Sequence, residues 1–172
     1  MADKLITFDN VSKNFGAIKA LENVNIRVDT GEFLSLVGPS GCGKSTILRI
    51  ASGLDEISSG TLNTGTSKIG YVFQDSTLMP WRTVRKNIEF LAELEKIDKQ
   101  IIKNKTNDII ELVGLQDFTE HYPIALSGGM KMRASLARSL VLEPELFLFD
   151  EPFGALDLIT RGKLNVDLMQ LY

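Results

Sequence analysis

The sequence predicts an α/β fold, and three of its features support this class. Two short runs, residues 33–37 and 146–149, have the nearly continuous apolar character of strands buried on both faces of a parallel sheet. A glycine-rich loop and a helical pattern follow the first run, giving the order strand, loop, helix. The 172 residues are 44% hydrophobic and 24% charged, which is typical of a globular domain and excludes collagen-like, disordered and disulfide-scaffold proteins.

The elements that precede the glycine-rich loop are predicted to be strands. Leu5 and Thr7 lie in a short strand-like run, and residues 24–28 alternate between apolar and polar side chains as a half-buried strand does. Residues 33–37 form the buried strand that enters the loop. A helix is predicted over residues 44–52, and Gly53 stands where a left-handed C-terminal cap is expected.

The second half of the sequence is predicted to be mainly helical. Short strands are expected between residues 61 and 73, followed by a helical insertion with a charged outer face over residues 82–111. Another helix is predicted after Gly129, with Pro144 ending it before the apolar strand 146–149. A last helical pattern places Leu164, Leu168 and Leu171 on one face.

Charge and cysteine content limit the partners and the compartment. Nineteen basic against 22 acidic residues give a net charge of −3 and a pI near 5.3, which argues against binding a nucleic-acid backbone. The single cysteine, Cys42, cannot form an internal disulfide and fits a reducing compartment. The sequence has no apolar run long enough to span a membrane and no secretory signal pattern, so a cytoplasmic protein is expected.

Residues 38–46, with the sequence GPSGCGKST, match the phosphate-loop pattern G-x-x-x-x-G-K-[ST] between a predicted strand and a predicted helix. Backbone N–H groups of such a loop surround phosphate oxygens, and the helix N-terminus adds partial positive charge. Lys44 is expected to reach the β- and γ-phosphates, and the Ser45 hydroxyl to bind Mg²⁺. The alternatives are a glycine-rich turn without a ligand and, for Cys42, either a small loop filler or a reactive thiol.

An acidic pair follows the second apolar strand. Asp150 is expected to hold Mg²⁺, directly or through water, and Glu151 to orient and deprotonate the attacking water. On its own such a pair would be better explained as a solvated turn. Together with the phosphate loop it predicts a site for metal-assisted phosphoryl transfer.

These motifs and three more make the sequence similar to ATP-binding cassette (ABC) ATPases. The segment Leu126-Ser127-Gly128-Gly129-Met130 resembles the family's LSGGQ signature, residues 155–157 resemble its D-loop, and Gln74 resembles its Q-loop glutamine. The resemblance implies a P-loop NTPase (RecA-like) core with an N-terminal antiparallel β portion and an inserted α-helical subdomain. It divides the chain into a nucleotide-binding core at 1–80, a helical subdomain at 81–128, and residues 129–172 with the signature helix, the acidic pair, the D-loop and the start of a C-terminal helix.

The resemblance also implies a role for individual residues. It assigns nucleotide binding to Phe15, Gly38, Pro39, Ser40, Gly41, Cys42, Gly43, Lys44, Ser45 and Thr46. It assigns catalysis to Lys44, Gln74 and Glu151, and the metal to Ser45, Gln74 and Asp150. Ser127, Gly128, Gly129 and Met130 would act on ATP held by a partner cassette, with Asp157 in the D-loop.

The implied function is an ATPase subunit of an ABC importer that uses ATP and Mg²⁺. Met130 in place of the usual glutamine, and the segment LMPWRTV at residues 78–84, are similar to importers of nitrate, sulfonates and taurine. Implied partners are a second ATPase subunit in a homodimer, transmembrane permease subunits and, indirectly, an extracytoplasmic solute-binding protein, with no nucleic acid. The expected location is the cytoplasmic face of the plasma (inner) membrane, as a peripheral subunit.

Several alternatives stay open at this stage. Phe15 would either stack on adenine or belong to the core. The alternative to a signature role for Ser127 is that it is only a helix cap, and the alternative to a Q-loop role for Gln74 is that it is the polar end of an edge strand. Trp81 would dock a permease helix or pack in a satellite core. The family's switch histidine is expected after the D-loop, whereas the one histidine, His121, precedes the signature. The chain is therefore expected to be a cassette cut short, and an ATP-binding module with little turnover, or a soluble non-transport ABC ATPase, are the rival functions.

Overall fold

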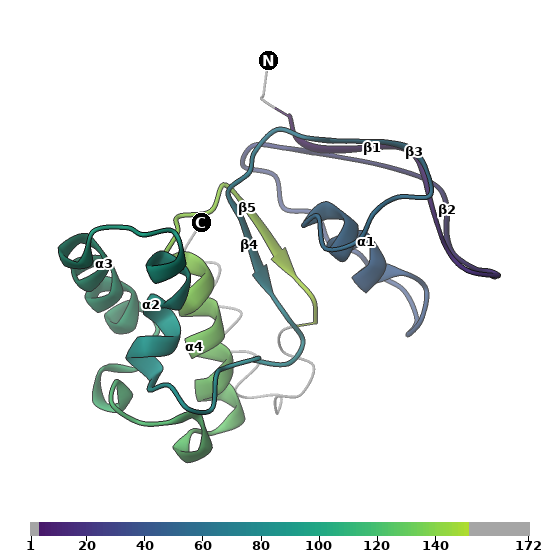
Figure 1. The fold of residues 1–172 in the computed structure, drawn as a ribbon. Helices are drawn as coiled ribbons and strands as arrows, with labels where there is room; N and C mark the ends of the chain where they lie inside the picture. Colours follow the sequence, from purple (N-terminus) through teal and green to yellow (C-terminus); the bar gives the residue numbers. More distant parts are fainter. Residues whose placement is uncertain (1–3, 152–172) are drawn as a thin grey trace. The chain divides into compact units, whose positions relative to one another are not determined.

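A computed structural model describes residues 4–151, which divide into two compact units (Figure 1). The first unit takes residues up to Tyr71 together with 145–150, and the second takes residues 72–144 and 151. Elements of the first unit are β1 (Lys4–Phe15), β2 (Ile18–Asp29), α1 (Lys44–Ala51), β3 (Ser59–Thr64), β4 (Ile69–Val72, whose last residue falls in the second unit) and β5 (Leu146–Phe149). Those of the second are α2 (Val84–Leu94), α3 (Lys99–Leu112), the 3-10 turns η1 (Gln116–Phe118) and η2 (Pro123–Ala125), and α4 (Gly128–Leu140).

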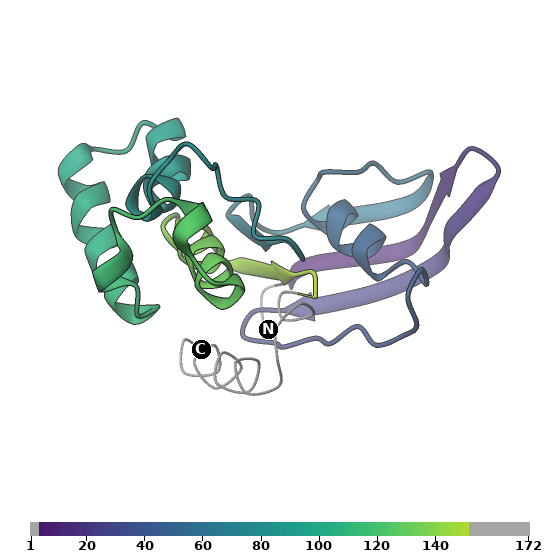
Figure 2. The ribbon, with the colours of Figure 1, turned by 90° about the horizontal axis from the view of Figure 1, so that it is seen from below.

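An antiparallel sheet with the strand order β2-β1-β3 forms one side of the first unit (Figure 2). Phe8 at the centre of β1 pairs with Ile26 of β2 and with Leu62 of β3, and it is almost fully buried. The strands predicted near residues 5–7 and 24–28 are confirmed, although each is longer than the sequence pattern indicated. Alternating apolar side chains account for this sheet, because one of its faces is buried and the other is polar.

The core of the first unit joins this sheet to α1 and to β5. Ile50 and Ala51 of α1 are in one buried cluster with Leu146 and Leu148 of β5. The helix ends as predicted, since Gly53 adopts a left-handed φ of 76° directly after the C-cap. The short strand β5 pairs with β4, and this brings residues from distant parts of the sequence together.

The prediction of a strand at residues 33–37 is wrong for this structure. No described strand pairs with this segment, and Phe33 and Val37 are 79% and 92% exposed rather than buried on both faces. An extended segment becomes a strand only where a neighbouring strand offers backbone partners, and apolar composition does not supply them. Residues 33–37 therefore enter the phosphate loop as an irregular segment with exposed apolar side chains.

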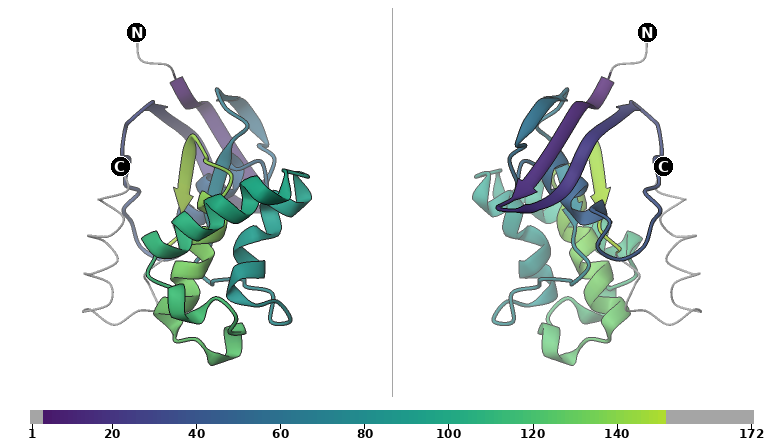
Figure 3. Two further views of the ribbon diagram at one scale, coloured as in Figure 1. Left: turned by 90° about the vertical axis from the view of Figure 1, so that its left-hand side faces the viewer. Right: turned by 90° about the vertical axis from the view of Figure 1, so that its right-hand side faces the viewer.

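The second unit is built from α2, α3 and α4, which pack together as Figure 3 shows. The helical insertion predicted over residues 82–111 is confirmed as α2 and α3. Ile88 of α2, Ile110 of α3 and Ala134 and Ala137 of α4 share one buried cluster. Helix α4 ends at Leu140, one turn before the predicted stop at Pro144.

The range of described residues limits what the structure says about membrane spans and about the C-terminal motifs. None of the helices in residues 4–151 is long and apolar enough to cross a membrane. The last predicted helix, with Leu164, Leu168 and Leu171, and the D-loop residue Asp157 lie outside the described residues.

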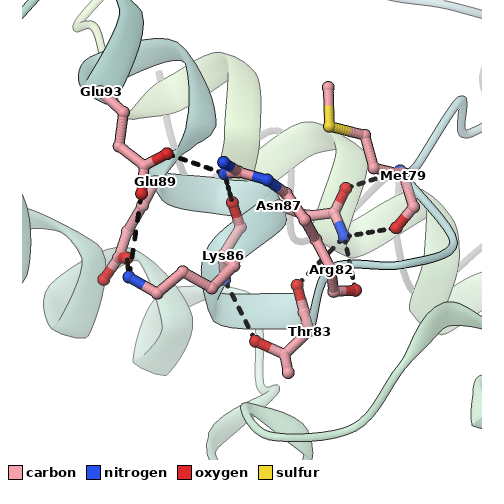
Figure 4. A network of polar contacts seen from close by, with 7 residues as sticks. All are labelled: Met79, Arg82, Thr83, Lys86, Asn87, Glu89 and Glu93. Atoms are coloured by element: carbon pink, nitrogen blue, oxygen red, sulfur yellow. Dashed lines mark hydrogen bonds and ion pairs between the residues drawn. The ribbon is translucent and has the colours of Figure 1, made fainter.

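A buried amide fixes the loop that leads into α2. Asn87 is fully buried; its Oδ1 accepts the Met79 N–H at 2.7 Å, and its Nδ2 donates to the carbonyls of Met79, Arg82 and Thr83 at 3.0–3.1 Å (Figure 4). The Thr83 hydroxyl caps α2 by accepting the Lys86 N–H. One side chain thus satisfies backbone groups of a loop that has no secondary structure of its own.

We expect Asn87→Ala to lower the free energy of unfolding by about 2–3 kcal/mol, because the Met79 N–H and the Arg82 carbonyl lose the hydrogen bonds that they make to this buried amide. Denaturant unfolding followed by Trp81 fluorescence measures this, since Trp81 is the one tryptophan and lies in the same loop. Asn104→Ala on α3, where the exposed amide only accepts from Gln100 at 3.0 Å, is the matched control and should change stability by less than about 0.5 kcal/mol. Equal losses in the two variants would show that the buried network contributes nothing specific.

Candidate phosphate-binding site

The loop at residues 38–43 turns sharply before α1, and two glycines make that turn. Gly41 and Gly43 have φ values of 82° and 98°, in the left-handed region that favours glycine. A Cβ atom on Gly43 would lie 2.7 Å from Leu21 Cδ2 and 2.9 Å from the Ala20 carbonyl oxygen. Gly43 is therefore required both by its backbone conformation and by the close approach of β2.

Lys44, the first residue of α1, places its ammonium group over the loop. Its Nζ donates to the carbonyl oxygens of Gly38 at 2.9 Å and Pro39 at 3.0 Å. The first N–H groups of a helix lack acceptors within the helix, so they add partial positive charge beside this cation. The loop, the lysine and the helix N-terminus together form a cradle suited to an anion such as a phosphate group.

Asp150 lies beside the first turn of α1, although 105 positions separate it from Ser45 in sequence. The Ser45 hydroxyl donates to Asp150 Oδ1 at 2.8 Å, and the Tyr71 hydroxyl donates to Asp150 Oδ2 at 3.1 Å. Asp150 directly follows β5, and Tyr71 belongs to β4, so the pairing of these two strands sets the position of the carboxylate.

Tyr71 is a site residue that the sequence did not single out. In the sequence it is one of several alternating residues of a predicted strand, and only the pairing of β4 with β5 brings it to Asp150. Burial raises the pKa of the Tyr71 hydroxyl, and the charge of Asp150 and the hydrogen bond to it raise that pKa further. The Tyr71 hydroxyl therefore stays protonated and remains a hydrogen-bond donor that orients the Asp150 carboxylate.

The oxygen atoms of Ser45 and Asp150 fit a magnesium ion. Mg²⁺ prefers oxygen ligands and is usually held by one or two protein groups plus waters and substrate phosphates. A hydroxyl and a carboxylate oxygen 2.8 Å apart, beside a phosphate cradle, form such a donor set. Among residues 4–151 no cluster of three or more His, Cys, Asp or Glu side chains forms a separate metal site.

The other predicted residues of the first unit are placed as follows. Phe15, at the end of β1, is 47% exposed, and Lys13 Nζ lies 4.8 Å from its ring centroid. This excludes a core position and leaves ring surface accessible for stacking. Cys42 is an exposed free thiol in the loop.

The second unit carries the signature residues. Ser127 is the N-cap of α4 and its hydroxyl accepts the Met130 N–H at 3.3 Å, so its capping role is confirmed. Gly128 and Gly129 are the first residues of α4, which leaves the helix N-terminus without side chains over it. Such an end suits an anion, as the start of α1 does.

The remaining predicted side chains of the second unit are exposed. Gln74 and Glu151 are both exposed, and Glu151 has a left-handed φ of 46°. Trp81 is 73% exposed, which excludes a satellite-core position. His121 packs against Phe118, with ring centroids 5.4 Å apart. Within the first unit, the structure brings Lys44, Ser45 and Asp150 together, whereas Gln74, Glu151 and the signature belong to the second unit.

Comparison with protein families gives a match over most of the chain. The family model described as "ABC transporter" matches residues 21–154. The chain is 43% identical to the nitrate import ATP-binding protein NrtD of Synechocystis sp. over 164 residues, covering 91% of this chain and 62% of that protein. It is 40% identical to the probable sulfate/thiosulfate import ATP-binding protein CysA of Chlorella vulgaris, covering 97% of this chain and 75% of that protein.

Two more comparisons extend this match. The chain is 40% identical to the aliphatic sulfonates import ATP-binding protein SsuB of Bacillus thuringiensis, covering 97% of this chain and 70% of that protein. The dimeric structure of the ATP-binding cassette MJ0796 bound to ADP and Pi is similar with a TM-score of 0.85 and 34% identity, covering 96% of this chain and 82% of that one. The chain thus spans between about three fifths and four fifths of the length of these proteins.

The two left-handed glycines give a matched pair of substitutions. We expect Gly43→Ala to lower the free energy of unfolding by about 1–3 kcal/mol more than Gly41→Ala does. Both alanines carry a strained φ, but a Cβ at Gly41 meets nothing within 4 Å, whereas one at Gly43 would overlap Leu21 and the Ala20 carbonyl. Denaturant unfolding of both variants measures the difference, and equal losses would contradict the packing of this loop on β2.

The Tyr71–Asp150 hydrogen bond predicts a change in titration. In Asp150→Asn the pKa of Tyr71 should fall toward its ordinary value of about 10, while burial keeps it above that value. Absorbance of the tyrosinate ion as a function of pH measures this, with Tyr71→Phe identifying its contribution among the three tyrosines.

The same shift fixes the sign of a stability effect. Because the folded-state pKa is raised, the contribution of Tyr71 to stability is complete below pH of about 10 and is lost as the pH rises from there through the folded-state pKa. An unchanged Tyr71 titration in Asp150→Asn would contradict the hydrogen bond.

Proposed function

This chain belongs to the ABC transporter ATPase family, and from that premise we propose that it is the ATP-hydrolysing subunit of an importer for a small anion. The single observation that carries the proposal is the hydrogen bond between Ser45 and Asp150. It joins the phosphate loop to the carboxylate after β5, which is the arrangement that a nucleotide triphosphate with its metal requires.

The residues of the first unit would bind and orient ATP. Lys44 would exchange its contacts with the Gly38 and Pro39 carbonyls for the β- and γ-phosphate oxygens, and the N–H groups of the loop would donate to the phosphates. Phe15 would stack on the adenine ring with its exposed face. Ser45 and Asp150 would hold Mg²⁺, which when bound neutralises charge that develops on the β- and γ-phosphates.

The attacking water would be oriented and deprotonated by two residues of the second unit, Glu151 and Gln74. Glu151, which directly follows Asp150, would accept a proton from that water, and Gln74 would hold it or the metal in place. Ser127 and the bare N-terminus of α4 would bind the γ-phosphate of ATP held by a second cassette. Asp157 would take the place of the D-loop aspartate in the same dimer.

The proposed partners follow from this shared site. Each cassette supplies one phosphate loop and one signature, so a homodimer would bury two ATP molecules, and the similar cassette bound to ADP and Pi is dimeric. Transmembrane permease subunits would dock near the exposed Trp81, and an extracytoplasmic solute-binding protein would deliver the substrate. The ATPase would therefore be peripheral at the cytoplasmic face of the inner membrane.

The proposed substrate class is nitrate, a sulfonate, taurine or a similar small anion. The substitution of Met130 in the signature and the segment at 78–84 support this branch, as do the names of NrtD and SsuB. The name of CysA points to sulfate and thiosulfate, which widens the class to oxyanions.

Dimerisation tests the shared-site mechanism. We expect Glu151→Gln to bind MgATP without hydrolysing it and to change from monomer to dimer, because removing the base stops turnover while the phosphate contacts remain. Size-exclusion chromatography with light scattering, on the full-length protein with and without MgATP, measures the change. A variant that stays monomeric with ATP bound would overturn the shared site.

Lys44→Ala is the control for this experiment. In the background of Glu151→Gln it should abolish the MgATP-induced dimer, because the γ-phosphate loses its cation. If the wild-type chain binds ATP but shows no turnover above that of Glu151→Gln, it is an ATP-binding module and the assigned hydrolysis is wrong.

A further inference from the structure

Arg138 connects α4 to the segment that follows Gln74. Its Nη1 donates to the Thr77 carbonyl at 3.0 Å, and its Nη2 donates to the Thr77 hydroxyl at 2.9 Å and to the Ser76 carbonyl at 3.3 Å. We call residues 74–83, which run from Gln74 to the N-cap of α2, the connecting segment. One guanidinium group thus holds three oxygen atoms of this segment.

The environment of Arg138 shows that this contact is a specific one. The side chain is half-buried, burial lowers the pKa of its guanidinium group, and no carboxylate pairs with it in the part of the chain that the structure describes. A charge withdrawn from water without a counter-ion is stabilised only by its hydrogen bonds. All of those described go to Ser76 and Thr77.

Thr77 is held in a strained conformation at the same place. Its φ of 44° lies in the left-handed region, which a β-branched residue rarely adopts. Such strain persists only where surrounding contacts fix the backbone, and Arg138 holds both the carbonyl and the hydroxyl of this residue.

The other end of the connecting segment is fixed from α2. Asn87 accepts from and donates to Met79, and it donates to the Arg82 and Thr83 carbonyls (Figure 4). Arg138 from α4 and Asn87 from α2 therefore hold the segment on both sides of Trp81, which itself remains 73% exposed. The signature Ser127 stands at the N-terminus of the same α4, about 16 Å along the helix from Arg138.

We propose that Arg138 is a positioning residue that fixes the connecting segment to α4, so that the signature, Gln74 and the Trp81 surface move as one body. The consequence for activity rests on the proposed function. When nucleotide binding shifts Gln74, the shift would reach both the signature and Trp81. A helix transmits displacement along its axis because its backbone hydrogen bonds keep it rigid.

Arg138→Met tests the proposal in the full-length protein. We expect kcat for ATP hydrolysis to fall about tenfold with KM for ATP changed less than twofold, since the phosphate loop belongs to the other unit and keeps its contacts. Acrylamide quenching of Trp81 should increase by about a third, which is near the limit for a side chain already 73% exposed, because the segment loses one of its two anchors. Arg133→Met is the matched control: this arginine lies on the same helix and donates to the Val113 carbonyl at 3.4 Å, outside the connecting segment.

Substitutions at Thr77 test the same contact from its other side. Thr77→Ala removes the hydroxyl that accepts from Arg138. It should lower kcat about threefold and increase Trp81 quenching, in each case less than Arg138→Met does. Thr77→Ser keeps the hydroxyl and should restore wild-type values. This pair decides the proposal if Arg138→Met does not fold, as judged by circular dichroism.

The proposal is overturned if Arg138→Met and Arg133→Met change kcat and Trp81 quenching equally, or if kcat falls without any change at Trp81. A wild-type protein that fails to bind or hydrolyse ATP would refute the proposed function instead. The Trp81 comparison between the variants would then still show whether Arg138 holds the segment.

Discussion

The hydrogen bond between Ser45 and Asp150 is the contact on which the site of the first unit depends. It requires α1 to begin directly after the phosphate loop and β5 to end at the acidic pair, so it fixes two sequence-distant elements at one point. The buried cluster that joins α1 to β5 gives this contact its support, because Ile50 and Leu148 leave little freedom to either element. Tyr71 then orients the remaining carboxylate oxygen from β4. A polar site of this kind is precise only because an apolar core holds the elements that carry it.

In the second unit, side chains from two helices hold the irregular connecting segment and pair with its backbone groups. Helices α2 and α4 each contribute one polar side chain, Asn87 and Arg138, that satisfies carbonyls of this segment. Both side chains occupy positions on helices that an apolar cluster fixes, so the segment gains the rigidity of its surroundings. The exposed Trp81 therefore lies on a segment that side chains of two helices hold in place.

The sequence predicted most elements correctly and failed in an informative way at residues 33–37. The strands of the first sheet, the helix after the phosphate loop, the helical insertion and the strand before Asp150 follow from periodicity and from Gly53 as a stop signal. Residues 33–37 have the composition of a buried strand, yet Val37 is 92% exposed because no described strand pairs with them. Periodicity reports which residues prefer burial, whereas a strand also needs a partner that only the tertiary structure supplies.

The motifs for phosphate and metal were visible in the sequence because their chemistry requires particular residues at fixed local spacings, as in residues 38–46 and in the pair Asp150 and Glu151. That Ser45 and Asp150 meet was decided by the packing of α1 on β5, and the role of Tyr71 was decided by the pairing of β4 with β5. Arg138 and Asn87 carried no local signal, since each acts on backbone groups that no sequence pattern identifies. The sequence by itself determined the chemistry and the family, and only the tertiary structure decided which side chains hold that chemistry in place, because contacts between distant residues depend on how the elements pack.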